Sequence, residues 1–226
     1  MTAGLPHGEA PMLRAGPAGD AATLGLVLLH GRGGSAADIL GLSRLSGRDD
    51  IAAIAPQADG HSWWPVSFLA PMDALQPWLD GALAAVDSAV AALRADGLAP
   101  DAIAVAGFSQ GGCLALEWAA RRGGPLKAVA GFSAGLVGTA DLPGARPDPT
   151  LRGHGPKAMD QPGRLDGVPV WLGCHTEDPH IPAARVQDSA KRLRALGAEV
   201  ACQLHPGAGH SLTRADAIAF RGLLGD

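Results

Sequence analysis

The feature that most constrains the fold of this chain is a regular alternation of short apolar segments with longer segments of helical periodicity. Each apolar segment is five or six residues long, and most contain almost no polar side chain. Strands that are apolar on both faces are typical of a parallel sheet with helices on both sides. The candidate strands are 24–29, 51–55, 102–106, 128–132, 168–172 and 199–204. Only the last has an alternating pattern, which favours a position nearer the edge of the sheet.

The segments between these strands carry the spacing of amphipathic helices. The clearest is 75–95, where leucines and valines recur at steps of three or four until Gly97 ends the pattern. A second, 182–196, has a proline in its first turn and a glycine after its end. Further helices are expected at 35–46, 110–122 and 212–224. The alternation predicts an α/β fold with a doubly wound, mostly parallel sheet and no large cap domain.

Two stretches depart from this alternation. Residues 1–20 show no period, and we expect a loosely ordered N-terminal arm there, followed by a single domain over residues 21–226. Residues 138–167 hold five prolines and no hydrophobic period. A loop of that length in a compact domain is functional or mobile, and we interpret it as an excursion near the active site.

Composition and charge exclude several classes of function. The formal net charge of −4 argues against a broadly basic surface that binds nucleic acid. No uninterrupted run of 18 apolar residues occurs, which argues against a membrane-spanning helix. Three cysteines without a CxxC pair predict neither a disulfide framework nor a zinc knuckle. Residues 1–20 lack the apolar stretch of a signal peptide, so we expect a cytoplasmic protein.

The sequence contains the G-x-S-x-G pattern of a nucleophile elbow twice, around Ser109 and around Ser133. Both copies follow an apolar strand. An elbow needs a strand, a sharp turn and then a helix, and only Ser109 is followed by a good helical segment, 110–122. Ser133 is followed by glycines and then by Pro143, which deny a helix. We therefore predict Ser109 as the nucleophile and Ser133 as an ordinary serine at a strand end.

A serine nucleophile needs a histidine base and an acid that orients it, and in α/β-hydrolases the chain order is Ser, acid, His. His210 follows the last strand in a flexible Gly-Ala-Gly-His-Ser loop, whereas His205 lies at the strand end and is interpreted as structural. The loop after the preceding strand offers Glu177 and Asp178, and Asp178 is favoured because a proline and the next helix follow it closely. Asp166 precedes that strand and lies at the opposite end.

Two further patterns were weighed as sites. His175 and His180 flank these carboxylates, but two histidines in one loop do not make a metal site without a third ligand. The glycine-rich segment 30–34 ends the first strand, where a backbone N–H can stabilise an oxyanion. The alternatives for 30–34 are a plain turn or a phosphate cradle, but it lacks the Lys-Ser/Thr of a P-loop.

Taken together, these blocks resemble the phospholipase/carboxylesterase family of small α/β-hydrolases, which includes acyl-protein thioesterases. The resemblance spans roughly residues 22–224. The blocks that carry it are Leu29-His30-Gly31-Arg32-Gly33, Ser62-Trp63, Gly107-Phe108-Ser109-Gln110-Gly111-Gly112, Asp178-Pro179-His180-Ile181-Pro182 and Gly209-His210. The chain departs from the family where Gly33-Gly34-Ser35 replaces a common Gly-Asp pair, and in its proline-rich excursion. Both departures concern the substrate rather than the chemistry.

The resemblance implies an α/β-hydrolase fold with a Ser109–Asp178–His210 triad. It also implies an oxyanion hole formed by the backbone N–H groups of Arg32 and Gln110, with no metal and no cofactor. Trp63, Val137 and Ile181 are the candidate substrate-binding residues. For Trp63 the alternative is packing against helix 75–95, and packing is the interpretation favoured for Trp78.

The function expected from this sequence is a serine carboxylesterase that hydrolyses short- to medium-chain esters through an acyl-enzyme. The alternatives are an acyl thioesterase or lysophospholipase on the same triad, and, more remotely, a non-catalytic binding protein on a hydrolase scaffold. The expected partner is a small-molecule ester, without nucleic acid or a membrane span. The sequence leaves the oligomeric state open, a homodimer included.

Overall fold

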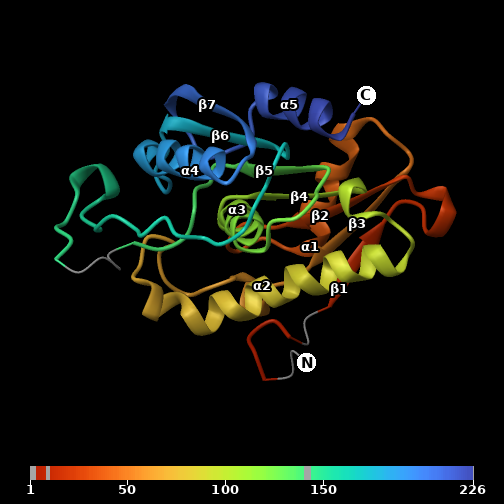
Figure 1. The fold of residues 1–226 in the computed structure, drawn as a ribbon, viewed down its shortest axis with the longest axis horizontal. Coiled ribbons are helices and arrows are strands. Elements are labelled where there is room, and N and C mark those ends of the chain that lie inside the picture. Colours follow the sequence, from red (N-terminus) through yellow and green to blue (C-terminus); the bar gives the residue numbers. More distant parts are fainter. Residues whose placement is uncertain (1–3, 9–10, 140–143, 226) are drawn as a thin grey trace.

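The computed structural model describes residues 4–8, 11–139 and 144–225. Its strands form one seven-stranded sheet in the order β1-β3-β2-β4-β5-β6-β7 (Figure 1). The first pairs antiparallel to its neighbour, and all other pairs are parallel. The strands are β1 Met12–Ala15, β2 Leu24–Leu29, β3 Ile51–Pro56, β4 Ile103–Phe108, β5 Ala128–Phe132, β6 Pro169–Glu177 and β7 Glu199–Ala208.

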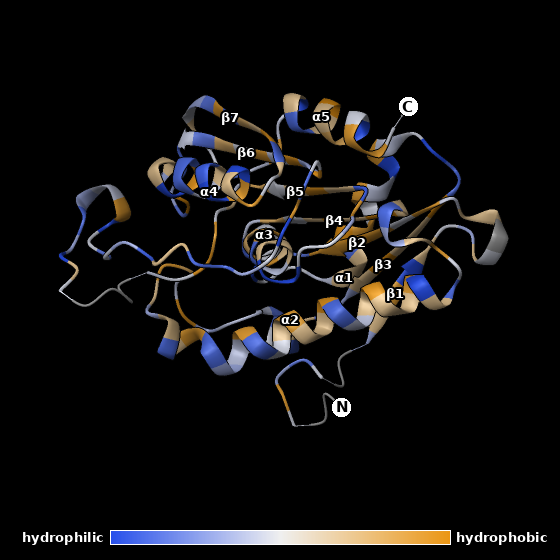
Figure 2. Ribbon diagram, in the orientation of Figure 1, coloured by the Kyte–Doolittle hydropathy of each residue, from blue (hydrophilic) through white to orange (hydrophobic). Residues whose placement is uncertain are grey.

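Helices cover both faces of this sheet. Their bounds are α1 Ala36–Leu40, α2 Met72–Ala95, α3 Gln110–Arg122, α4 Ala183–Ala195 and α5 Arg214–Leu224. Because side chains alternate along a strand, each strand supplies both cores. In β2, Val27 and Leu29 pack toward α2 and α3, whereas Leu26 and Leu28 pack toward α1 and α5. Figure 2 shows the apolar centre of the sheet and the mixed colouring of the helices outside it.

The α/β-hydrolase fold predicted from the sequence is confirmed, and every expected strand and helix is present. The main difference is length. Strands β6 and β7 continue past their apolar parts, as far as the pairing of Glu177 with Ala208. Backbone pairing does not depend on side-chain polarity, so the polar ends of these strands gave no sequence signal. The extension matters because it carries the acid and histidine loops to the same edge of the sheet.

The N-terminal arm is more ordered than the sequence indicates. Met12–Ala15 form an edge strand paired with β3. His7 is buried, with its Nε2 3.0 Å from the carbonyl oxygen of Trp63. A four-residue edge strand has no core-facing period of its own, which explains why its sequence predicts no strand.

A buried ion pair between Lys157 and Glu117 connects the excursion to α3. Glu117 of α3 is fully buried and accepts hydrogen bonds from Lys157 Nζ at 3.0 Å and from Val137 N at 3.0 Å. Burial raises the pKa of Glu117, but Lys157 and Arg121 outweigh this and hold it below its usual value. In Figure 1 the described part of the excursion runs beside α4 and the beginning of α2. No helix in the described ranges is long and apolar enough to cross a lipid bilayer.

Candidate active site

The turn between β4 and α3 has the geometry of a nucleophile elbow. Ser109 has φ 54° and ψ −120°, a strained conformation that L-residues seldom adopt. The two glycines of the motif are required by close packing. A Cβ on Gly107 would lie 2.4 Å from the carbonyl carbon of Gly111, and one on Gly111 would lie 2.1 Å from the Leu29 oxygen. The motif therefore lets α3 start directly against β2 and β4.

Three side chains from three separate loops meet above this elbow. The Ser109 hydroxyl donates to His210 Nε2, at an Oγ–Nε2 distance of 2.8 Å. His210 Nδ1 lies 2.8 Å from Asp178 Oδ2 and 3.0 Å from Asp178 Oδ1. The rings of Phe108 and His180 pack against the His210 ring, with centroids 5.0 Å and 4.7 Å away. The structure thus brings together the serine, histidine and acid that the sequence singles out.

The environment of Asp178 keeps its carboxylate ionised. The side chain is buried, and burial raises its pKa. Hydrogen bonds from His210 and from the backbone N–H groups of His180 and Ile181 outweigh this and lower the pKa of Asp178 to about 2. The two amide bonds to Oδ1 are 2.7 Å and 3.0 Å long. A carboxylate held in this way orients a neutral imidazole and stabilises its protonated form.

Two backbone amides lie beside the serine. Gly31 lies against the elbow, because a Cβ on it would be 3.4 Å from Ser109 Cβ. This places the segment that contains Arg32 next to the first residue of α3, Gln110. Within the described residues, no hydrogen bond is formed to the backbone N–H of Arg32 or of Gln110. Two amides without a partner beside this serine are what the predicted oxyanion hole requires.

A cavity of about 520 Å³ opens at this point, a size that suits a small-molecule ligand. One wall is apolar and comes from the loop after β3 and from α3: Trp64, Val66, Phe68, Leu69 and Cys113. The cavity is also lined by His180, Ile181 and His210, together with Arg152 and His154 of the excursion. The predicted contact at Ile181 therefore lies on the cavity.

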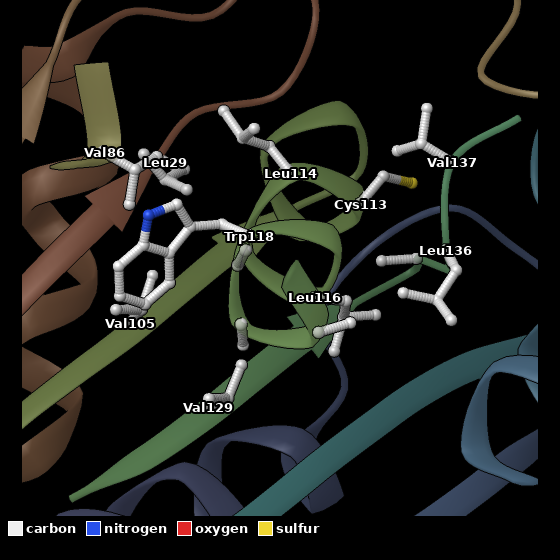
Figure 3. Packing of buried hydrophobic residues seen from close by; sticks show 14 of the residues in the cluster. Leu29, Val86, Val105, Cys113, Leu114, Leu116, Trp118, Val129, Leu136 and Val137 are labelled. Atoms are coloured by element: carbon white, nitrogen blue, oxygen red, sulfur yellow. The ribbon is translucent and has the colours of Figure 1, made fainter. Parts of the chain in front are cut away.

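The other two predicted substrate contacts do not line this cavity, and both predictions are corrected here. Trp63 is fully buried, and its Nε1 donates to the carbonyl oxygen of His30 at 2.9 Å. Its neighbour Trp64 lines the cavity instead. Val137 is also fully buried and lies beside Cys113 in the core below the site (Figure 3). Trp78 is partly exposed, with its ring 6.4 Å from that of His7.

Buried polar groups decide which tryptophan faces the cavity. The Gln110 side chain accepts from Trp63 N at 2.9 Å and donates to the Trp64 oxygen at 2.9 Å. The His30 ring accepts from Ala58 N at 3.1 Å and lies 2.8 Å from the Gly31 oxygen, which fits a neutral imidazole with its proton on Nδ1. Burial lowers the pKa of His30, which favours this neutral form.

The residues that were weighed against the triad lie elsewhere. Glu177 is exposed and does not line the cavity. His205 is buried and bonds Asp216 at 3.1 Å, which fits a structural role at the base of α5. Asp166 pairs with Arg164 at 2.6 Å. Ser133 also has a positive φ, 45°, but it is buried at the end of β5 and outside the cavity lining.

Among the cavity residues that sequence reasoning missed are Arg152 and His154. Both lie in the excursion, where no periodicity indicates which side chains turn toward the sheet. The sequence signal that could have identified them is a tight turn: Asp148 caps Thr150 and pairs with His154 across the turn.

The described ranges hold no group of three His, Cys, Asp or Glu side chains that could bind a metal ion.

Comparison with known proteins agrees with this geometry. The model of the dienelactone hydrolase family matches residues 72–220, which include Ser109, Asp178 and His210. The chain belongs to the dienelactone hydrolase family. A solved phospholipase/carboxylesterase from Dyadobacter fermentans is 34% identical, with 96% of each chain covered and a TM-score of 0.84. The family resemblance seen in the sequence is thereby confirmed.

Two other relatives are an esterase and an acyl-protein thioesterase. The solved esterase PE8 is 26% identical, with 95% of this chain and 96% of that chain covered and a TM-score of 0.68. Acyl-protein thioesterase 1 of Gibberella zeae is 31% identical over 118 residues, or 51% of this chain. The match spans only 43% of that fungal protein. The relatives thus place the chain in a hydrolase family of the carboxylesterase and thioesterase type.

Proposed function

We propose that this chain is a serine carboxylesterase that hydrolyses short- to medium-chain esters through an acyl-enzyme. The observation that carries the proposal is the unbroken hydrogen-bonded series Asp178–His210–Ser109 beside a cavity and beside two backbone amides that have no partner among the described residues. In this proposal Ser109 Oγ attacks the ester carbonyl while His210 Nε2 takes its proton. The amides of Arg32 and Gln110 stabilise the oxyanion, aided by the positive N-terminal end of α3.

The second half of the reaction uses the same groups. His210 gives its proton to the leaving oxygen as the acyl–oxygen bond breaks. Water then attacks the acyl-enzyme, with His210 as base, and releases the carboxylic acid. An acyl thioesterase on the same triad is the second candidate, because the Gibberella zeae relative bears that name. Rates on an ester and a thioester with the same acyl group separate the two.

A fluorophosphonate probe tests the proposal directly. The wild type should be labelled on Ser109, as located by peptide mass spectrometry, and should hydrolyse p-nitrophenyl butyrate. Ser109→Ala should show neither property. Ser133→Ala is the matched control, because it removes the same hydroxyl from the second G-x-S-x-G pattern. Labelling on Ser133, or none at all, would contradict the proposal.

A further inference from the structure

Basic side chains line the cavity, and the proposed reaction does not use them as proton carriers. They are those of Arg32, Arg152, His154 and His180, whereas no aspartate or glutamate among the described residues lines the cavity. The Arg32 guanidinium donates to the carbonyl oxygens of Pro65 and Val66, on the loop that carries the apolar wall, which leaves Arg152 as the arginine on the side of His180 and His154. The nearest carboxylate, Asp178, is buried and bonded to His210. In a chain with a net charge of −4, this concentration of basic groups is confined and specific. It indicates recognition of negative charge at the cavity.

Arg152 lies in a small hydrogen-bonded turn. The backbone of Asp148 pairs with that of His154 across the turn, with an N–O distance of 2.9 Å. Leu151 is buried at the base of the turn and lies beside α4. Arg152 itself has a left-handed backbone conformation with φ 57°. Hydrogen bonds within the turn and the packing of Leu151 therefore define the backbone position of Arg152.

The guanidinium of Arg152 is fixed but keeps its charge. It donates to the carbonyl oxygens of Asp178 and Pro179. Carbonyls orient a guanidinium without neutralising it, and no carboxylate in the described part of the chain pairs with Arg152. Two donors of the five on a guanidinium satisfy these carbonyls, which leaves N–H groups for a ligand. A pre-oriented arginine of this kind suits a carboxylate or a phosphate.

The position of Arg152 indicates which part of an ester would carry the charge. His210 must protonate the leaving oxygen, so the leaving group lies on the His210 side of the cavity. Arg152 is bonded to the backbone of Asp178, the residue that holds His210. The apolar wall, which includes Trp64 and Phe68, lies on the loop tied to Gln110 beside the predicted oxyanion amides and suits the acyl chain.

We propose that the preferred substrates are esters with an apolar acyl group and an anionic leaving group, in which Arg152 binds a carboxylate or phosphate on the leaving alcohol. This proposal rests on the proposed serine esterase function. Hydrolysis adds water across the acyl–oxygen bond. It yields a carboxylic acid with an apolar chain and an alcohol that keeps its anionic group. Arg152 acts on binding of the leaving group and takes no part in proton transfer.

A set of chromogenic butyrate esters tests this. The anionic probe is 3-butyryloxy-4-nitrobenzoate, and its neutral match is the corresponding benzamide. A phosphorylated nitrophenol ester distinguishes phosphate from carboxylate, and 4-nitrophenyl hemiglutarate places the charge on the acyl side instead. Each kcat/KM is divided by the rate of alkaline hydrolysis of the same ester, which removes differences in intrinsic reactivity. The readout is the ratio of anionic to neutral probe for each protein variant.

In the wild type this ratio should exceed one and should decrease as salt is added. Arg152→Gln should lower it by about three- to tenfold, since a partly exposed charge-assisted hydrogen bond is lost. Arg152→Lys keeps the positive charge but loses the planar, pre-oriented donors, so it should retain only part of the ratio. Arg164→Gln is the matched control, because Arg164 is an exposed arginine of the same excursion that pairs with Asp166 away from the cavity. It should leave the ratio unchanged.

Four results would overturn the inference. A ratio that does not change in Arg152→Gln would remove Arg152 from substrate recognition. A dependence on Arg152 for the hemiglutarate alone would place the charge on the acyl side. Hydrolysis of both matched probes with no preference would contradict an anionic leaving group while the proposed esterase function stands. Absence of fluorophosphonate labelling at Ser109 would instead overturn the esterase function and this inference together.

Discussion

The acid of the proposed triad allows a sharp test, because only one of its two oxygens accepts from backbone amides. Asp178 Oδ1 accepts from the amides of His180 and Ile181 and lies 3.0 Å from His210 Nδ1, whereas Oδ2 lies 2.8 Å from the same nitrogen. In Asp178→Asn the single oxygen must stay with the two amides. The new NH₂ group then takes the place of Oδ2, the oxygen nearer to His210 Nδ1, and disfavours a proton on that nitrogen. The imidazole is forced into the tautomer with its proton on Nε2, and it cannot accept the proton of Ser109.

We expect Asp178→Asn to lower kcat on p-nitrophenyl butyrate by about 10³–10⁴, equivalent to roughly 4–5.5 kcal/mol of transition-state stabilisation. Fluorophosphonate labelling of Ser109 should slow in parallel, and the melting temperature shows whether the variant is folded. Glu177→Gln is the matched control, since Glu177 is the adjacent carboxylate and is exposed. It should change kcat by less than about threefold. Equal losses in the two variants, or an Asn variant with a tenth of wild-type activity, would refute the reasoning.

Four further outcomes are expected. Ser109→Ala should lower ester hydrolysis by several orders of magnitude, because a triad acts as a unit, and Ser133→Ala should keep turnover within about tenfold of wild type. Across p-nitrophenyl esters, the transition-state stabilisation calculated from kcat/KM should increase by at most ~0.8 kcal/mol per methylene up to medium chains and then level off. Trp64→Ala should penalise the longer esters selectively, while Trp63→Phe should lower stability to urea by about 1–3 kcal/mol and leave that selectivity unchanged. A rate that still rises at C16 would contradict the cavity size. Because the folded state lowers the pKa of His30, stability should fall as the pH drops below about 6.5, by up to ~1.4 kcal/mol per pH unit. The test measures the free energy of unfolding in urea between pH 7.5 and 5.5. The same pH dependence in wild type and in His30→Gln would refute this prediction.

The sequence by itself determined the layers of the fold and the choice of Ser109 as the candidate nucleophile. Hydrophobic period is a local property, so each strand and helix can be recognised from neighbouring residues alone. The same holds for the elbow: Ser109 is distinguished from Ser133 by the helix that follows it. The predictions of Asp178 and His210 depended on chain order and on the rule that parallel strands end at one edge of the sheet. In the structure His210 Nδ1 lies 2.8 Å from Asp178 Oδ2, and His210 Nε2 lies 2.8 Å from Ser109 Oγ.

Only the tertiary structure decided which loop residues face the cavity. Trp63 and Trp64 are adjacent and chemically identical, and no local pattern separates them. The separation comes from Gln110 and from the carbonyl oxygen of His30, which hold Trp63 in the core. The same reason applies to Arg152. Its turn is formed by neighbouring residues, but the carbonyl groups that its side chain bonds lie 26 and 27 residues further along the chain. Loop orientation is set by long-range hydrogen bonds between segments, and those bonds exist only once the chain has folded.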